Sequence, residues 1–212
     1  MKLINEYIDS LFAPTDKDLE DVLTSIEENG MRSISVSPGS GKLLTMLVSL
    51  SQAIEVLEIG ALGGYSGICL ARGFGSEGYL TSLELEENYA TLAHQNLTKA
   101  GFGNQVTYLT GPALESLQIL KENNKQYDFF FIDADKLNYI NYLNACIELA
   151  KDGAIIVTDN VLAGGSVADS NSQPKRYSEF MKEFNKTVAE HSQLQSVLIP
   201  IGDGMTVSRV IK

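Results

Sequence analysis

The chain lacks several features that would place it in a broad class of protein. No apolar run approaches the ~20 residues of a transmembrane helix, and charges interrupt the amino-terminal segment too often for a signal peptide. Only two cysteines occur, Cys69 and Cys146, far apart and in apolar surroundings. We expect both to be buried and reduced, as in a reducing compartment. The sequence therefore predicts a soluble, cytoplasmic protein without a membrane partner.

Positive charge is scarce. The 16 lysines and arginines face 27 acidic residues, which gives a net charge of −11. Nucleic-acid-binding proteins need a basic surface, so we expect no nucleic-acid partner. The negative net charge still allows one locally positive site for a small anionic substrate. A length of 212 residues with 44% hydrophobic residues is typical of one globular domain. We divide it into an amino-terminal helical segment, residues 1–50, and a core, residues 51–212.

Several common catalytic motifs are missing. No Gly-x-Ser-x-Gly elbow occurs, and His94 and His191 have no partner pattern, so we expect solvent-facing or structural roles for both. Residues 38–42, Pro-Gly-Ser-Gly-Lys, resemble a phosphate-binding loop, but Val36 replaces its first glycine and Leu43 its final Ser or Thr. We reject that interpretation.

Strand and helix patterns alternate through the core. Apolar strands are expected at 54–59, 79–85, 106–110, 127–132 and 154–159, and helices at 65–72, 87–100, 114–122, 139–150 and 177–190. This alternation predicts a parallel sheet with helices on both faces. The chain ends in strands 196–201 and 205–211, joined by Gly202-Asp203-Gly204 as in a hairpin. One terminal strand must therefore run antiparallel.

The amino-terminal segment is expected to be helical over residues 1–30, with Pro14 separating two helices. Asp16 or Thr15 is the candidate cap of the second helix, and Gly30 its end. A loop over 31–39 and a helix over 41–50 follow. The polar loop 163–175 is either a mobile cover over the sheet edge or an ordinary surface loop.

Polar side chains follow two of the expected buried strands. Asp133 comes after residues 127–132, and the pair Asp159-Asn160 follows residues 154–158. Ligands bind at the carboxyl ends of strands in open α/β sheets, and two carboxylates with one amide are oxygen ligands suited to Mg²⁺. Lys136 lies one helical turn after Asp133. The alternative is that these residues only cap helices, because Asp and Asn are favoured caps.

A glycine-rich turn, residues 58–66, closes the first strand. The dinucleotide-binding pattern starting at Gly60 fails, because Leu62 and Tyr65 occupy its second and third glycine positions. The Glu58-x-Gly-x-x-x-Gly pattern is nevertheless common in sites for S-adenosylmethionine, although a plain tight turn is the alternative. Glu84 ends the second strand, where a carboxylate can accept both ribose hydroxyls of an adenosine cofactor.

These motifs, taken in order, resemble the class I cation-dependent O-methyltransferases, the group with the catechol and caffeoyl-coenzyme A O-methyltransferases and many small bacterial relatives. The resemblance extends from about Val36 to the final hairpin. It rests on Val-Ser-Pro-Gly-Ser-Gly-Lys-Leu-Leu, Val-Leu-Glu-Ile-Gly-Ala-Leu-Gly-Gly-Tyr-Ser-Gly, Thr-Ser-Leu-Glu, Gly-Pro-Ala-Leu-Glu, Phe-Ile-Asp-Ala-Asp-Lys, Thr-Asp-Asn-Val and Ile-Gly-Asp-Gly-Met. It implies a Rossmann-like fold with a mostly parallel seven-stranded sheet.

The resemblance also implies the site residues. The cofactor site for S-adenosylmethionine would comprise Val36, Glu58, Gly60, Ser66, Glu84, Ala113 and Asp133. The ligands of a divalent cation would be Asp133, Asp159 and Asn160, with Mg²⁺ favoured and Mn²⁺ or Ca²⁺ as alternatives because oxygen ligands suit all three. Lys136 matches the catalytic base, and a cation nearby would depress its pKa.

The expected reaction is methyl transfer to one hydroxyl of a catechol-like phenol. One departure concerns Ala134-Asp135, because animal catechol enzymes carry an aromatic substrate wall there, and this chain has no tryptophan. The acceptor pocket is therefore expected to differ. Alternatives are a metal-independent methyltransferase of a small molecule or protein, a nicotinamide oxidoreductase and a non-enzymatic cofactor-binding protein. Relatives often pair, so we expect a homodimer, with the amino-terminal helices as its interface or as a lid.

Overall fold

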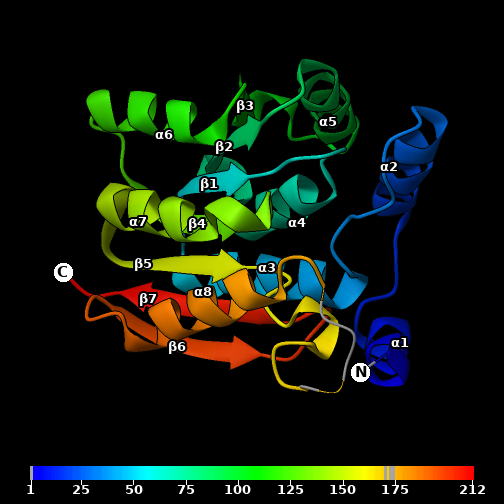
Figure 1. The fold of residues 1–212 in the computed structure, drawn as a ribbon. Helices are drawn as coiled ribbons and strands as arrows, with labels where there is room; N and C mark the ends of the chain where they lie inside the picture. Colours follow the sequence, from blue (N-terminus) through cyan, green and yellow to red (C-terminus); the bar gives the residue numbers. More distant parts are fainter. Residues whose placement is uncertain (1, 170, 172–174) are drawn as a thin grey trace.

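A computed structural model describes residues 2–169, 171 and 175–212 of the chain (Figure 1). Its strands are β1 Glu55–Ile59, β2 Tyr79–Glu84, β3 Val106–Thr110, β4 Tyr127–Ile132, β5 Ala150–Thr158, β6 Leu194–Ile199 and β7 Met205–Val210. Its α-helices are α1 Lys2–Phe12, α2 Lys17–Glu28, α3 Pro38–Ser51, α4 Tyr65–Phe74, α5 Glu87–Lys99, α6 Ala113–Glu122, α7 Tyr139–Leu149 and α8 Ser178–Glu190. The predicted alternation of strands and helices is confirmed.

The strands form one seven-stranded sheet in the order β3-β2-β1-β4-β5-β7-β6. The pairs from β3 through to β5 are all parallel, whereas β7 is antiparallel to both of its neighbours, β5 and β6. The chain order reverses beside β1, where the next strand in sequence, β2, lies on one side and β4 on the other. This confirms the expected Rossmann-like fold with a single antiparallel strand in the terminal hairpin.

Helices cover both faces of the sheet, and each face has its own apolar layer (Figure 1). Side chains such as Phe130 and Ile156 point to the layer beneath α6, α7 and α8. Their neighbours Phe129, Phe131 and Val157 point the other way, to the layer that includes side chains from α2, α3, α4 and α5. Strands buried on both faces explain why the central strands are continuous apolar runs.

Several element boundaries differ from the sequence predictions, and three of them illustrate the causes. Helix α3 begins at Pro38 rather than at Gly41, because the Ser37 hydroxyl caps it by accepting a hydrogen bond from the backbone N–H of Ser40. Strand β5 begins at Ala150, four residues early, across a register shift in its pairing with β4. Strand β6 lies two residues earlier than predicted, and Pro200, which has no N–H to donate, follows its end.

The predicted division at Pro14 is confirmed, and Asp16 caps α2 by accepting from the backbone N–H of Leu19 at 3.3 Å. The hydrogen bonds that hold helix α1 to the rest of the molecule include one from Asn5 Nδ2 to the Gly202 carbonyl at 2.7 Å and one from the Gly39 N–H to Asp9 Oδ1 at 2.8 Å.

One face of α1 is apolar and exposed, and it carries Leu3, Ile4, Tyr7, Leu11 and Phe12. The homodimer stays a prediction, for which this face is the candidate surface. No helix within the described ranges combines the length and the apolar character needed to cross a bilayer.

The loop after β5 is tied to the terminal hairpin through one residue. Asp203 Oδ1 accepts from the Gly164 N–H at 2.7 Å, and its other oxygen lies 3.5 Å from Lys175 Nζ. These contacts anchor both described ends of the loop predicted over 163–175. Residues 170 and 172–174 lie outside the described part of the chain, so the choice between a cover and an ordinary surface loop stays open.

Candidate active site

The carboxyl edge of the parallel strands is held by hydrogen bonds that continue the ladder one residue beyond each strand. The backbone N–H groups donate to neighbouring strands, from Gly60 to Leu83 (2.8 Å), Gly111 to Glu84 (3.0 Å), Asp133 to Ile59 (2.9 Å) and Asp159 to Ile132 (3.1 Å). These strand-end bonds fix the backbone of the predicted site residues. The side chains that leave the edge therefore start from set positions.

Gly60 is where the glycine turn meets the end of β4. Its φ is +98°, and a Cβ there would lie 2.1 Å from the carbonyl oxygen of Asp133. Only glycine tolerates both that backbone conformation and that contact. The turn expected to face the cofactor is thus packed directly against a residue expected to face the metal.

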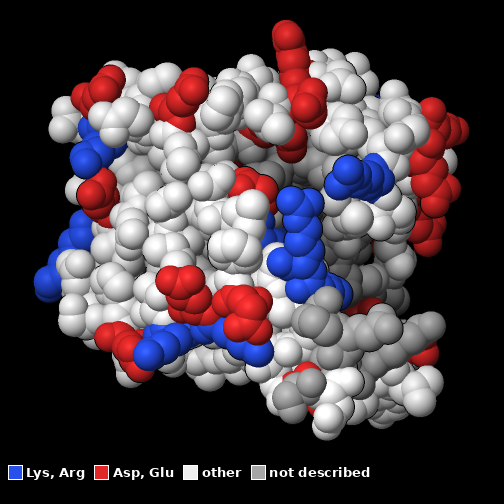
Figure 2. Space-filling view, viewed as in Figure 1, with Lys and Arg blue, Asp and Glu red and all other residues white. Residues whose placement is uncertain are grey.

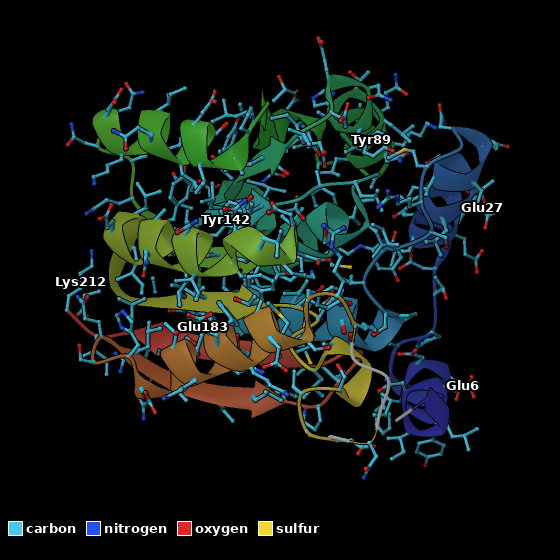
Figure 3. All side chains as sticks on the ribbon, viewed as in Figure 1. Glu6, Glu27, Tyr89, Tyr142, Glu183 and Lys212 are labelled. Carbon is cyan, nitrogen blue, oxygen red and sulfur yellow. The ribbon has the colours of Figure 1, made fainter. Side chains whose placement is uncertain are left out.

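A cavity of about 820 Å³ opens at this edge, and Figure 2 shows basic side chains beside the hollow in the right half of the view. Its walls come from several elements, and the Tyr89 and Tyr142 that line it are labelled on α5 and α7 in Figure 3. The lining includes most of the predicted site residues, namely Val36, Gly60, Ser66, Glu84, Ala113, Asp133, Lys136 and Asn160. Glu58 and Asp159 do not line the cavity; they lie buried behind its wall.

Glu58 is fully buried at the end of β1 and bonded to two hydroxyls. Ser66 Oγ donates to one carboxylate oxygen at 2.5 Å, and Ser82 Oγ to the other at 2.6 Å. Burial raises the pKa of Glu58 to about 7, against the opposing effect of the two hydroxyls. Glu58 therefore does not line the cavity itself. It orients the hydroxyl of Ser66, which does.

Glu84 accepts hydrogen bonds from the glycine turn itself. Its Oε2 receives the backbone N–H groups of Ala61 at 3.1 Å and Leu62 at 2.9 Å, while Oε1 receives that of Glu86 at 3.1 Å. The carboxylate thus holds the turn in place, and it lines the cavity at the same time. Oxygen atoms have more than one acceptor site, so these bonds leave capacity for ribose hydroxyls.

Lys136 lies among polar side chains at the ends of strands β4 and β5. Its Nζ donates to Asp133 Oδ1 and to Asn160 Oδ1, each at 2.9 Å, and also to the hydroxyl of Tyr139. The side chains of Lys136 and Asp133 are 14% and 19% exposed, so the group is only partly open to solvent. Asn160 adopts a φ of +61°, a left-handed conformation that Asn tolerates better than most residues. That turn lets the Asn160 amide face the same point as Asp133.

This geometry tests whether the predicted ligands suit a cation. Two oxygens from neighbouring strand ends already converge on one positively charged nitrogen, and Asp159 adds a buried carboxylate behind them. Burial, and next the charge of Asp133, raise the pKa of Asp159 above its ordinary value, so a cation near it would favour the ionised form. In the described parts of the chain no three His, Cys, Asp or Glu side chains gather as a metal site. The third predicted donor is the Asn160 amide, and the set fits an oxygen-binding cation.

The sequence analysis missed the residues that hold these groups. Tyr139 is 1% exposed, its hydroxyl donates to the Asp159 carbonyl at 3.1 Å, and its ring lies 4.6 Å from Lys136 Nζ. An aromatic residue opening a helix resembles any core residue, and only its spacing of three from Lys136 could have signalled the contact. The sequence motif assigned no role to Asp135, yet its side chain accepts a hydrogen bond from Tyr142 Oη at 2.5 Å and lines the cavity.

Comparison with known proteins decides the family. A family model described as O-methyltransferase matches residues 12–211, nearly the whole chain. The chain belongs to the O-methyltransferase family. The resemblance and the O-methyltransferase activity predicted from the sequence are thereby confirmed.

Several individual proteins are similar over most of their length. A catechol O-methyltransferase of Niastella koreensis is 37% identical and covers 98% of this chain and 96% of that protein. A caffeoyl-CoA O-methyltransferase of Populus trichocarpa is 36% identical, over 84% of this chain and 76% of that protein. Among solved structures, the O-methyltransferase from Bacillus cereus in complex with SAH has a TM-score of 0.88 at 34% identity, covering 98% and 97% of the two chains.

Proposed function

We propose that this enzyme transfers a methyl group from S-adenosylmethionine to one hydroxyl of a catechol-like phenol, with a divalent cation bound at Asp133, Asp159 and Asn160. The observation that carries the proposal is the convergence of Asp133 Oδ1 and Asn160 Oδ1 on the positively charged Lys136 Nζ, 2.9 Å from each, on the wall of the cavity. Mg²⁺ is the favoured ion, with Mn²⁺ and Ca²⁺ as alternatives.

The cofactor half of the proposal rests on the glycine turn and its two glutamates. Gly60 allows a close approach to the backbone, Ser66 presents a hydroxyl fixed by Glu58, and Glu84 presents a carboxylate for ribose. Ala113, at the start of α6, lines the cavity where adenine would lie. Relatives support the cofactor, because solved structures of similar enzymes hold SAH or SAM.

The acceptor half rests on the polar group around Lys136. A divalent cation held by Asp133, Asp159 and Asn160 would supply positive charge that makes the protons of the acceptor's phenolic hydroxyls easier to remove. Asp133 and Asn160 would hold it at the cavity wall, and the buried Asp159 would balance its positive charge. The catechol and caffeoyl-CoA O-methyltransferases among the relatives support an acceptor with vicinal hydroxyls.

Lys136 is the proposed catalytic residue. Its Nζ is hydrogen-bonded to two of the proposed ligand oxygens, so the nitrogen would move aside for a cation held by them and stay close to an acceptor hydroxyl at the same wall. The nitrogen would accept that hydroxyl's proton or, as an ammonium, stabilise the phenolate. In either role the residue orients the acceptor oxygen for in-line attack, from which much of the rate acceleration can come.

The first experiment is methyl transfer from labelled S-adenosylmethionine to a panel of phenols, with Mg²⁺ and with a chelator. We expect transfer to vicinal diols, no transfer to phenols with one hydroxyl, and loss of activity with the chelator. Transfer that survives chelation would remove the cation from the mechanism and favour a metal-independent methyltransferase. Cofactor binding without transfer to any acceptor would favour a binding role.

The sheet offers a matched control for the site variants. Asp128 lies near the start of β4, at the opposite end of the strand from Asp133, and it pairs with Lys151 at the same 2.9 Å that separates Asp133 from Lys136. We expect Asp133→Asn and Lys136→Ala to abolish most turnover. The control variants Asp128→Asn and Lys151→Ala should change the free energy of unfolding and leave turnover unchanged. Equal losses in both sets would refute the assignment.

A further inference from the structure

One wall of the cavity is formed by the connection between α2 and α3, and it carries polar groups that the proposed reaction does not use. Arg32 lines the cavity with an exposed side chain. Among the described residues its guanidinium makes no hydrogen bond or ion pair, and Glu86, which lines the same cavity, is not bonded to it. An unpaired guanidinium beside a ligand cavity, in a chain of net charge −11, calls for an anionic partner.

Four other charged side chains of the cavity have partners, whereas the Glu86 carboxylate has none among the described residues. Lys136 is bonded to Asp133, Glu84 holds the glycine turn, and Asp135 accepts from two side chains. Arg32 is thus the lining cation that remains free among the described residues.

Two neighbours of Arg32 make the wall suitable for a substituted aromatic ring. Ile34 lines the cavity with a side chain that is 62% exposed, which gives an apolar surface for a ring. Ser35 also lines it, and its hydroxyl is buried without a hydrogen-bond partner among the described residues. A buried hydroxyl without a partner is costly, so a ligand acceptor there would remove that cost. Arg32 and Ser35 together offer donors to an anion, beside apolar Ile34.

We propose that Arg32, Ile34 and Ser35 select a methyl acceptor whose ring bears the vicinal hydroxyls and also a short side chain that ends in a carboxylate. This inference rests on the proposed function and adds the charge of the acceptor to it. Arg32 would pair with the carboxylate, Ser35 would donate a further hydrogen bond, and Ile34 would pack against the ring. Arg32 is a specificity residue in this scheme, and it takes no part in the transfer itself.

The test compares acceptors that differ in charge and share the same diol: dihydroxyphenylpropanoate, its methyl ester and dihydroxyphenylethylamine. A partly exposed, charge-assisted bond contributes about 1.4 kcal/mol, so wild type should prefer the propanoate over the ester about tenfold in kcat/KM. The amine should be the poorest acceptor. The preference should shrink at high ionic strength, because salt screens exposed charges.

Variants assign the preference to Arg32. Arg32→Gln should bring the propanoate down to the rate of the ester while leaving the ester and the affinity for S-adenosylmethionine unchanged. Arg32→Lys should restore part of the preference, and Lys99→Gln, a charge change on the exposed end of α5, should leave it intact.

Three outcomes would overturn the inference. Equal rates for propanoate and ester in wild type would overturn it while leaving the proposed function in place, because the diols would still be methylated. A weaker affinity of Arg32→Gln for S-adenosylmethionine, matching its loss of rate, would assign Arg32 to the cofactor instead. No transfer to any of the three diols would refute the proposed function and this inference together.

Discussion

Replacing Tyr139 with Phe tests whether the environment of Lys136 governs turnover. The substitution keeps the ring, which lies 4.6 Å from Lys136 Nζ and packs edge-on against Phe184 at 5.4 Å. It removes the hydroxyl, and with it one of the three hydrogen bonds of Lys136 and the donor to the Asp159 carbonyl. Nζ keeps only Asp133 and Asn160 as partners. We expect a less fixed nitrogen in a site that still folds.

The size of the effect follows from the kind of bond that is lost. A hydrogen bond to a charged group contributes about 1.5–3 kcal/mol, which corresponds to about a 10- to 100-fold loss when it is needed to place a reacting group. We therefore expect kcat to fall by that factor while the affinity for S-adenosylmethionine stays unchanged. Initial-rate kinetics with saturating cofactor, and cofactor binding by calorimetry, measure the two quantities separately.

Tyr127→Phe is the matched control. Tyr127 is also 1% exposed, and it donates one hydrogen bond, to Thr81 Oγ1 at 3.2 Å, at the other end of β4. It should lose about 1 kcal/mol of unfolding free energy and keep full turnover. An unchanged kcat in Tyr139→Phe, or the same fall in both variants, would show that the bond to Lys136 has no part in methyl transfer.

Three further predictions concern stability. Gly60→Ala should lose at least about 3 kcal/mol, measured by urea unfolding, because its Cβ would lie 2.1 Å from the Asp133 carbonyl at a φ of +98°. Burial raises the pKa of Glu58 from 4.5 to about 7, so the folded state binds this proton more tightly than the unfolded state. Stability should therefore fall by about 3 kcal/mol as pH rises from about 4.5 to 7, and Glu58→Gln should flatten that dependence in denaturation curves across pH. Asp16→Ala removes the cap of α2 and the bonds to Arg72 at 2.6 and 3.0 Å, and should cost about 1 kcal/mol in thermal unfolding because the pair is partly exposed.

The sequence was sufficient to predict the sheet because its strands are buried on both faces. Phe129 to Ile132 must be apolar in every position, and that run is visible without any structure. The ends of an element were less predictable where a residue type that is typical of loops also occurs in the first turn of a helix. Gly39 is typical of loops and is predicted to lie in one, yet here it lies in the first turn of α3 because Ser37 caps that helix and Pro38 suits its first position. Local composition does not distinguish those cases.

The site was predictable in its members and less so in its arrangement. Strand-end acids such as Asp133 and Glu84 are recognisable because the topology brings the ends of parallel strands together. The depth of a side chain depends on neighbours distant in sequence, so the burial of Glu58 between Ser66 and Ser82 could not be inferred. Arg32 gave no signal either, because its position on the cavity wall depends on where the fold places the connection between α2 and α3.

The strand-end hydrogen bonds have a consequence for how such an enzyme can change. They link the residues that carry the chemistry to the backbone of the sheet, so Gly60 and Asp133 cannot shift without breaking ladder bonds. The wall carrying Arg32 and Ile34 belongs to a connection outside the sheet. Substitutions in that wall can therefore alter which acceptor is accepted at little cost to folding or to methyl transfer. New substrate preferences can arise there one residue at a time, on a framework that stays the same.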